Sequence, residues 1–169
     1  SGVSAKEILP QIIFHRDNDE QEISKYDPKQ NTDVVELSKE MQKRRKHFEQ
    51  NEEIHKLSTV NKNCWSYIYE IITIKGTSKP HFCDLTGLGE ENYRKAERGL
   101  NNKPTVRTIV AIGVGLVLDI ETVENMLKLA GRSFMDTPED RALKFCITGL
   151  SGHSLEDCNG FLESLGYET

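Results

Sequence analysis

Cysteine and histidine are the residues of this chain whose chemistry includes nucleophilic attack and metal binding. The chain has four cysteines, Cys64, Cys83, Cys146 and Cys158. No two of them form a Cys-x-x-Cys pair, and no histidine stands at zinc-finger spacing from them. We therefore predict that the thiols are free and buried as small apolar residues, which is typical of a cytoplasmic protein.

Other patterns that could carry chemistry are incomplete. His47 and His55 lie eight residues apart and form no His-Glu-x-x-His motif. Gly113-Val114-Gly115 lacks the third glycine and the preceding strand of a dinucleotide-binding loop. No serine or cysteine stands in a recognisable nucleophile motif. We expect no metal site, no cofactor and no enzymatic activity.

A different set of residues has the spacing of two short helices joined by a tight turn. Ser78 can cap a helix that runs to about Thr86, and Gly87 can adopt the left-handed conformation that the turn needs. A second helix is predicted over residues 90–98, ending at Gly99. This is the geometry of a helix-turn-helix, whose second helix can lie in the major groove of DNA.

The two faces of this second helix differ in character. Leu88, Tyr93 and Ala96 fall on one face and would anchor it to the core, while the small side chain of Cys83 lets the two helices approach closely. The polar residues on the remaining surface are Glu90, Glu91, Asn92, Arg94, Lys95 and Arg98. This polar face remains free to meet a partner.

Five segments in order resemble one known family. Residues 82–88 (FCDLTGL), Tyr93 and residues 97–99 (ERG) resemble the helix-turn-helix of phage-repressor regulators of the Cro/XRE type. Residues 104–109 (PTVRTI) are similar to the family's loop and fourth helix, and residues 111–116 (AIGVGL) look like the end of that helix. The likeness covers about 70 of the 169 residues. It implies a five-helix, lambda-repressor-like core and a sequence-specific, DNA-binding transcriptional regulator.

The resemblance also implies roles for individual side chains. The residues that would face base edges are Glu90, Glu91, Asn92 and Lys95. Asparagine can pair with adenine, lysine with guanine, and glutamate with the cytosine amino group. The residues that would hold phosphates are Lys79, Asn101, Asn102, Lys103, Thr105 and Arg107. Arg94 and Arg98 would add positive charge near the DNA backbone.

The chain departs from the family pattern at three places. Lys79 stands where the family usually has glutamine, and Gly89 where it often has serine or threonine. Glu90 and Glu91 begin the expected recognition helix, where they either read bases or complement the helix dipole. Both interpretations of these carboxylates remain open.

The elements around this motif are predicted to be helical. A long helix is expected from about residue 32 to 57, with an apolar stripe that includes Met41 and Phe48 and a basic run at 43–46. That run is either a solvated face or an auxiliary contact with phosphate or a partner. Further helices are expected to begin near Trp65, Pro104, Asp119, Thr137 and Ser154. Before them, residues 8–14 form an edge strand or a packed extended arm.

The expected organisation is all-α. It consists of an extended arm and linker (1–30), a long amphipathic helix (31–60), a helix-turn-helix DNA-binding domain (61–131) and a C-terminal helical pair (132–169). No run approaches the roughly 18 apolar residues of a membrane span, so we expect no membrane partner.

Charge is unevenly distributed along the chain. The net charge is −5, but residues 61–131 carry nine Lys and Arg against eight Asp and Glu. Residues 132–169 carry three against seven. Any contact with nucleic acid must therefore come from a local patch in the middle segment.

Double-stranded DNA is the expected partner, bound by a homodimer through either the long helix or the acidic C-terminal pair. The C-terminal pair could also bind another protein. One alternative is a degenerate helix-turn-helix that serves as a protein-interaction module. Another is the DNA-binding end of a larger protein, in which Ser1-Gly2-Val3 is a processing or tag scar.

Overall fold

The structure, a computed structural model, describes the backbone of residues 31–169 and the side chains from Ser38 onward. The arm predicted at residues 8–14 and the linker after it lie outside the described residues. The chain divides into two compact units, Ser1–Lys43 and Arg44–Thr169. The second unit holds all the contacts described below.

The described residues form helices and no strand, which confirms the all-α class. The helices are α3 (Asn31–His55), α4 (Cys64–Lys75), α5 (Lys79–Thr86), α6 (Glu90–Arg98), α7 (Val106–Gly115), α8 (Ile120–Leu129), α9 (Pro138–Thr148) and α10 (Leu155–Ser164). None of these helices is long and apolar enough to cross a membrane.

Local capping residues set most of these helix ends. The Ser78 side chain accepts a hydrogen bond from the His81 amide at the start of α5, and Gly87 ends the helix with a φ of 68°. One start differs by two residues from the prediction. Pro104 does not open α7, because the Thr105 side chain caps the helix by accepting a hydrogen bond from the Thr108 amide.

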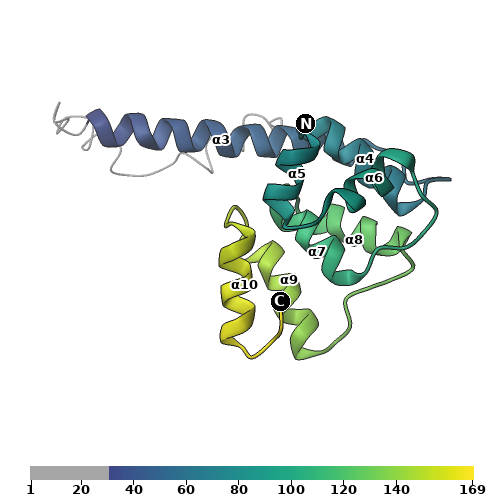
Figure 1. Ribbon diagram of the computed structural model, residues 1–169. Helices are drawn as coiled ribbons and strands as arrows, with labels where there is room; N and C mark the ends of the chain where they lie inside the picture. Colours follow the sequence, from purple (N-terminus) through teal and green to yellow (C-terminus); the bar gives the residue numbers. More distant parts are fainter. Residues whose placement is uncertain (1–30) are drawn as a thin grey trace, which may run out of the picture. The chain divides into compact units, whose positions relative to one another are not determined.

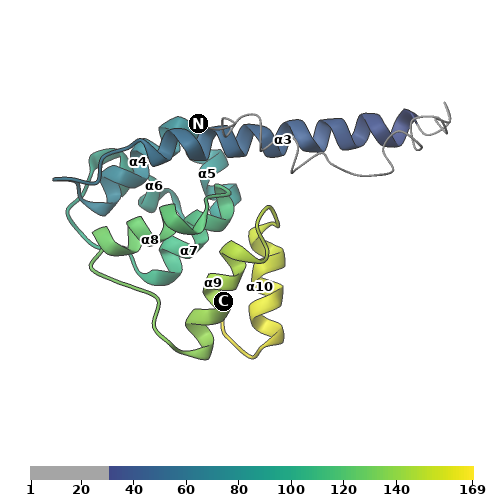
Figure 2. The same ribbon diagram turned by 180° about the vertical axis from the view of Figure 1, so that it is seen from behind.

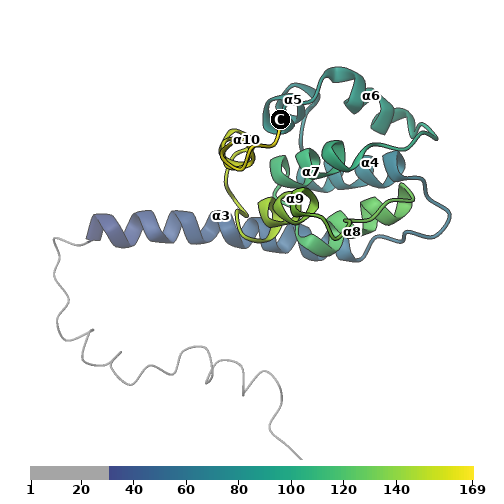
Figure 3. The ribbon, with the colours of Figure 1, turned by 90° about the horizontal axis from the view of Figure 1, so that it is seen from below.

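The helices of the second unit pack in layers. Viewed from below, α5 and α6 lie on one side of α4 and α7, while α8 and α9 lie on the other (Figure 3). The last two helices form an antiparallel hairpin that packs against α7 (Figure 1). From behind, α8 lies next to both α4 and α9 (Figure 2). Within the described part of the chain, α6 has an exposed face formed by Glu90, Glu91, Arg94, Glu97 and Arg98.

A single apolar core joins these helices. It contains Trp65 and Ile68 of α4, Phe82 of α5, and Ile109 of α7, all almost fully buried. Ile54, near the end of α3, is also fully buried in this core. Two residues of the stripe predicted along α3 are exposed instead, since Met41 and Phe48 are 63% and 64% exposed. Of the apolar α3 side chains that the structure describes, Ile54 near the end of the helix is the one in the core.

Two glycines of α7 allow neighbouring elements to come close. A Cβ atom at Gly115 would lie 2.6 Å from the Leu85 carbonyl oxygen of α5. One at Gly113 would lie 2.7 Å from the Val123 side chain of α8. These glycines serve helix packing, because any larger side chain would fill space that the adjoining elements occupy.

The cysteine prediction is confirmed for three thiols and wrong for the fourth. All four are free, and Cys64, Cys146 and Cys158 are buried. Burial raises the pKa of Cys64 to about 12, so its thiol stays protonated. Cys83 is only half-buried, because it lies at the edge of the contact between α5 and the core.

Candidate nucleic-acid interface

The segment α5–turn–α6 presents the polar face that the sequence predicted. Gly87 has the expected left-handed conformation, and Gly89 precedes α6 without a side-chain cap. Ala96 is buried, and Leu88 and Tyr93 pack against the core. These contacts hold one side of α6 on the domain.

Aromatic packing fixes the orientation of α6. The Tyr93 ring makes an edge contact with Phe82 of α5, at a centroid separation of 5.7 Å. It makes a second edge contact with Tyr69 of α4, at 6.3 Å. Tyr93 therefore ties α6 to two helices at once, and such pairs add to the stabilisation from burial.

Of the two carboxylates at the start of α6, Glu90 is paired with cations. Its Oε2 lies 3.0 Å from the Arg94 guanidinium, one turn later, and 3.9 Å from the Lys79 ammonium of α5. Glu91 is exposed, and no cation within the described residues lies within ion-pair distance of it. One acidic charge at the start of α6 is thus balanced and the other is open to solvent.

Three cations near this face have no acidic partner among the residues that the structure describes. They are Lys95 and Arg98 on α6 and Lys103 in the following loop. Their neighbours Asn101 and Asn102 are exposed, and Asn92 is half-buried on the flank of α6. The predicted residues from 90 to 103 therefore lie on α6 or in the loop that follows it.

Thr105 and Arg107 are engaged elsewhere in the fold. The Thr105 hydroxyl caps α7, and it also donates a hydrogen bond to the Thr108 hydroxyl at 3.0 Å. The Arg107 guanidinium pairs with Glu139 of α9 at 2.5 Å and donates a hydrogen bond to the Glu168 carbonyl. Arg107 therefore connects α7 to the C-terminal hairpin, and its charge is balanced within the chain.

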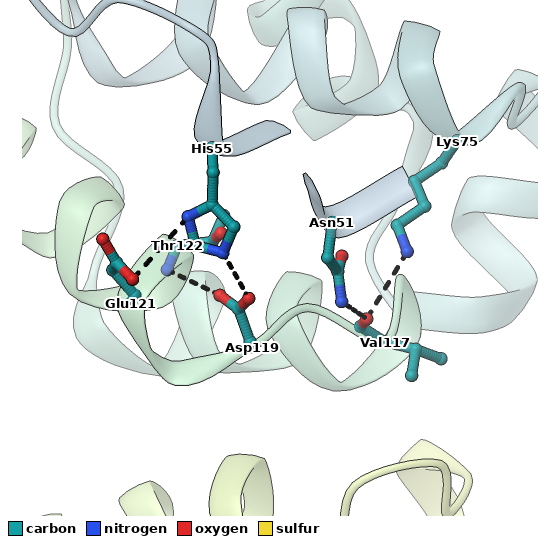
Figure 4. Close-up of polar contacts among 7 residues, drawn as sticks. All are labelled: Asn51, His55, Lys75, Val117, Asp119, Glu121 and Thr122. Carbon is teal, nitrogen blue, oxygen red and sulfur yellow. Dashed lines mark hydrogen bonds and ion pairs between the residues drawn. The ribbon is translucent and has the colours of Figure 1, made fainter. Parts of the chain in front are cut away.

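A polar cluster that the sequence analysis missed holds the end of α3 against the segment between α7 and α8 (Figure 4). His55 Nε2 lies 2.6 Å from Asp119 Oδ2, and its Nδ1 lies 3.7 Å from Glu121. Asn51 Nδ2 donates to the Val117 carbonyl at 3.2 Å. The sequence pointed to Asp119 as a helix cap and to His55 only through its spacing from His47, because the two partners are 64 residues apart.

The charges of this cluster depend on one another. The hydrogen bond between His55 and Asp119 raises the pKa of His55 above 6.5. Burial works against the charge on Asp119, but hydrogen bonds from the Thr122 amide and from His55 outweigh it and lower the pKa of the carboxyl.

Nearby, Lys75 donates a hydrogen bond to the Val117 carbonyl at 3.4 Å, and burial lowers the pKa of its ammonium group to about 8. The described side chains contain no group of three or more His, Cys, Asp or Glu that could hold a metal ion. The hydrogen bonds of the cluster join α3 and α4 to the segment between α7 and α8.

Comparison of the chain with models of protein families, with curated proteins and with solved structures finds no match.

Proposed function

We propose that this chain is a sequence-specific, DNA-binding transcriptional regulator of the Cro/XRE type, with α6 as its recognition helix. The observation that carries the proposal is the arrangement of α5, the Gly87 turn and α6, in which the outer face of α6 is open and charged. A helix held in this way can enter the major groove.

The charges on this surface support the proposal. Lys95 and Arg98 have their cationic groups free, and Lys103 adds a third in the next loop. Glu90 is balanced by Arg94 and Lys79, so it adds less repulsion toward phosphate than an isolated carboxylate would. In this proposal Asn92 and Lys95 read bases while Lys103, Asn101 and Asn102 contact phosphates.

A second candidate function is a protein-interaction module. Two observations favour it. Glu91 is unpaired on the outer face of α6, and Arg107, which the family resemblance assigns to phosphate, is already paired with Glu139. The overall net charge of −5 points the same way. In that case a basic protein surface, and not DNA, would bind α6.

The test is fluorescence anisotropy with a randomised duplex pool and the duplexes selected from it, at about 50 and 200 mM salt. The proposal predicts that selected duplexes bind at least about 1,000-fold more tightly than the pool. It also predicts that affinity falls steeply as salt rises, because phosphate contacts release counterions.

Charge reversal on α6 identifies the contact face. Lys95→Glu combined with Arg98→Glu should weaken binding by about 100-fold or more and leave the helical content unchanged. The matched control reverses two cations on α9, Arg141→Glu with Lys144→Glu, with the same change in net charge on the opposite layer. It should change affinity far less.

Two outcomes decide against the proposal. Equal loss in both double variants would mean that only net charge matters, so α6 would not be the contact face. Absence of binding at low salt by the folded chain would favour the interaction module. Sedimentation of the DNA complex then tests the expected homodimer, since two copies on one inverted repeat are predicted.

A further inference from the structure

A pocket of about 220 Å³ lies where α7 meets the α9–α10 hairpin. Most of its wall is apolar. The wall residues that matter here are Val110, Ala111 and Val114 of α7, Leu143 of α9, and Leu155 and Leu162 of α10. The thiols of Cys146 and Cys158 complete it, and both stay protonated because burial raises the pKa of each. The apolar part of the pocket wall therefore presents no charge.

Polar residues of α7 and α10 also line the pocket. They include Arg107, Thr108 and Asn159. The charge of Arg107 is balanced by Glu139. The half-buried Asn159 side chain forms no hydrogen bond with any described residue, so its amide is available as a donor.

The size and lining of the pocket limit what can fill it. A cavity of about 150 Å³ lined by aliphatic side chains is large enough for benzene. The present pocket has room for one ring and a small substituent. A charged ligand is disfavoured, because the only cation in the lining, Arg107, already has a carboxylate partner.

We propose that this pocket binds a compact, uncharged, mainly apolar molecule of about one ring, with a single acceptor atom to which the Asn159 amide donates a hydrogen bond. The apolar walls would supply most of the affinity through burial, and Asn159 would orient the ligand. This assignment does not depend on whether the chain binds DNA.

The pocket also reaches the turn that sets the position of α6. Leu88, in that turn, lines the pocket. Leu155 lines it too and packs on the turn itself, since a Cβ atom at Gly87 would lie 2.6 Å from Leu155 Cδ2. An occupant therefore presses on side chains that support the turn before α6. Any effect of the ligand on DNA affinity rests on the function proposed above.

The first test uses heteronuclear NMR of the full chain titrated with acetophenone, ethylbenzene and benzoate. Acetophenone should shift pocket signals, including the Ala111 and Leu155 methyls and the Gly87 amide, with a dissociation constant on the order of 1 mM. Ethylbenzene, which lacks the acceptor, should bind severalfold more weakly, and benzoate more weakly still. Absence of saturable shifts, or shifts confined to another surface, would overturn the proposal. Tighter binding of benzoate would overturn the uncharged class.

Two substitutions separate filling of the pocket from orientation of the ligand. Ala111→Leu fills the pocket and should weaken acetophenone at least tenfold, whereas Thr148→Leu adds bulk at an exposed site on α9 and should not. Asn159→Leu should reduce acetophenone affinity to that of ethylbenzene and leave ethylbenzene unchanged. If Asn159→Leu weakens both ligands equally, Asn159 does not orient the acceptor and that assignment fails. The Asn159 comparison keeps the proposal falsifiable if Ala111→Leu does not fold.

A final experiment distinguishes the proposed ligand pocket from the proposed DNA-binding function. If acetophenone binds in the pocket and no duplex binds at all, the pocket stands and the regulator proposal falls. If duplex binding is specific, saturating acetophenone should change its dissociation constant severalfold in the wild-type chain and not in Ala111→Leu. No change in the wild-type chain would overturn the coupling through Leu88 and Leu155.

Discussion

Several side chains of this protein form hydrogen bonds or ion pairs with residues far away in the sequence. His55 and Asp119 form the shortest such pair around α3, at 2.6 Å. The His55 side chain is 24% exposed and that of Asp119 is 38% exposed, so solvent screens the pair in part. The pair should nevertheless stabilise the attachment of the last turns of α3 in a manner that depends on pH.

The sign of that dependence follows from the two pKa shifts. A raised pKa of His55 stabilises the folded state below 6.5, and this stabilisation is lost as pH rises through the raised value. A lowered pKa of Asp119 stabilises the fold above 3.8, and that is lost as pH falls through the lowered value. The full effect lies between these two ordinary pKa values.

We predict that His55→Gln costs on the order of 1 kcal/mol in unfolding free energy at about pH 5.5 and clearly less at about pH 8.5. Urea unfolding at both pH values measures the difference. His153→Gln is the matched control, because His153 is exposed and pairs with Asp157, four residues later, just before α10. An equal cost of His55→Gln at both pH values would show that its ionisation does not contribute.

At the scale of elements, glycines decide how closely α7 approaches its neighbours. Gly113-Val114-Gly115 lacks the third glycine and the preceding strand of a dinucleotide-binding loop, and the structure shows that its glycines face α8, α9 and α5. At Gly115 the neighbouring atom belongs to the backbone of α5, which cannot move without displacing the helix.

Gly115→Ala should therefore destabilise the fold by about 1–3 kcal/mol, because the added methyl group overlaps the Leu85 carbonyl. Gly160→Ala in α10 is the matched control, since a Cβ atom there meets nothing within 4 Å. The control should stabilise by about 0.5–1 kcal/mol through the higher helix propensity of alanine. Denaturant unfolding of both variants tests the contrast, and a stabilising Gly115→Ala would refute the close approach.

At the scale of the whole molecule, the buried core extends beyond the predicted 61–131 domain. Ile54 of α3 is buried in the shared core, as are Leu143 and Ile147 of α9 and Leu162 of α10. Each fully buried side chain of this kind contributes about 1.5–3 kcal/mol. Together they are comparable to the roughly 5–15 kcal/mol by which whole domains are stable.

A fragment of residues 61–131 is accordingly expected to lack a cooperative thermal transition, whereas residues 44–169 should unfold in one step. Circular dichroism melting curves of the two fragments make the comparison. A third fragment, residues 44–131, isolates the contribution of α9 and α10 to the cooperativity of melting. Cooperative melting of 61–131 with the midpoint of 44–169 would contradict a shared core.

The sequence by itself determined the helical class, most helix ends and the open polar face of α6. These features depend on neighbours within about one turn. Ser78 caps its own helix, Gly87 sets its own turn, and Tyr93 and Ala96 recur at helical spacing. Such signals can be read directly along the chain.

The tertiary structure alone decided which residues meet across the fold. It paired His55 with Asp119 and Arg107 with Glu139, left Phe48 exposed while burying Ile54, and formed the pocket between α7 and the C-terminal hairpin. The physical reason is that each of these features depends on the packing of helices distant in sequence. No spacing along the chain specifies which surfaces will be brought together.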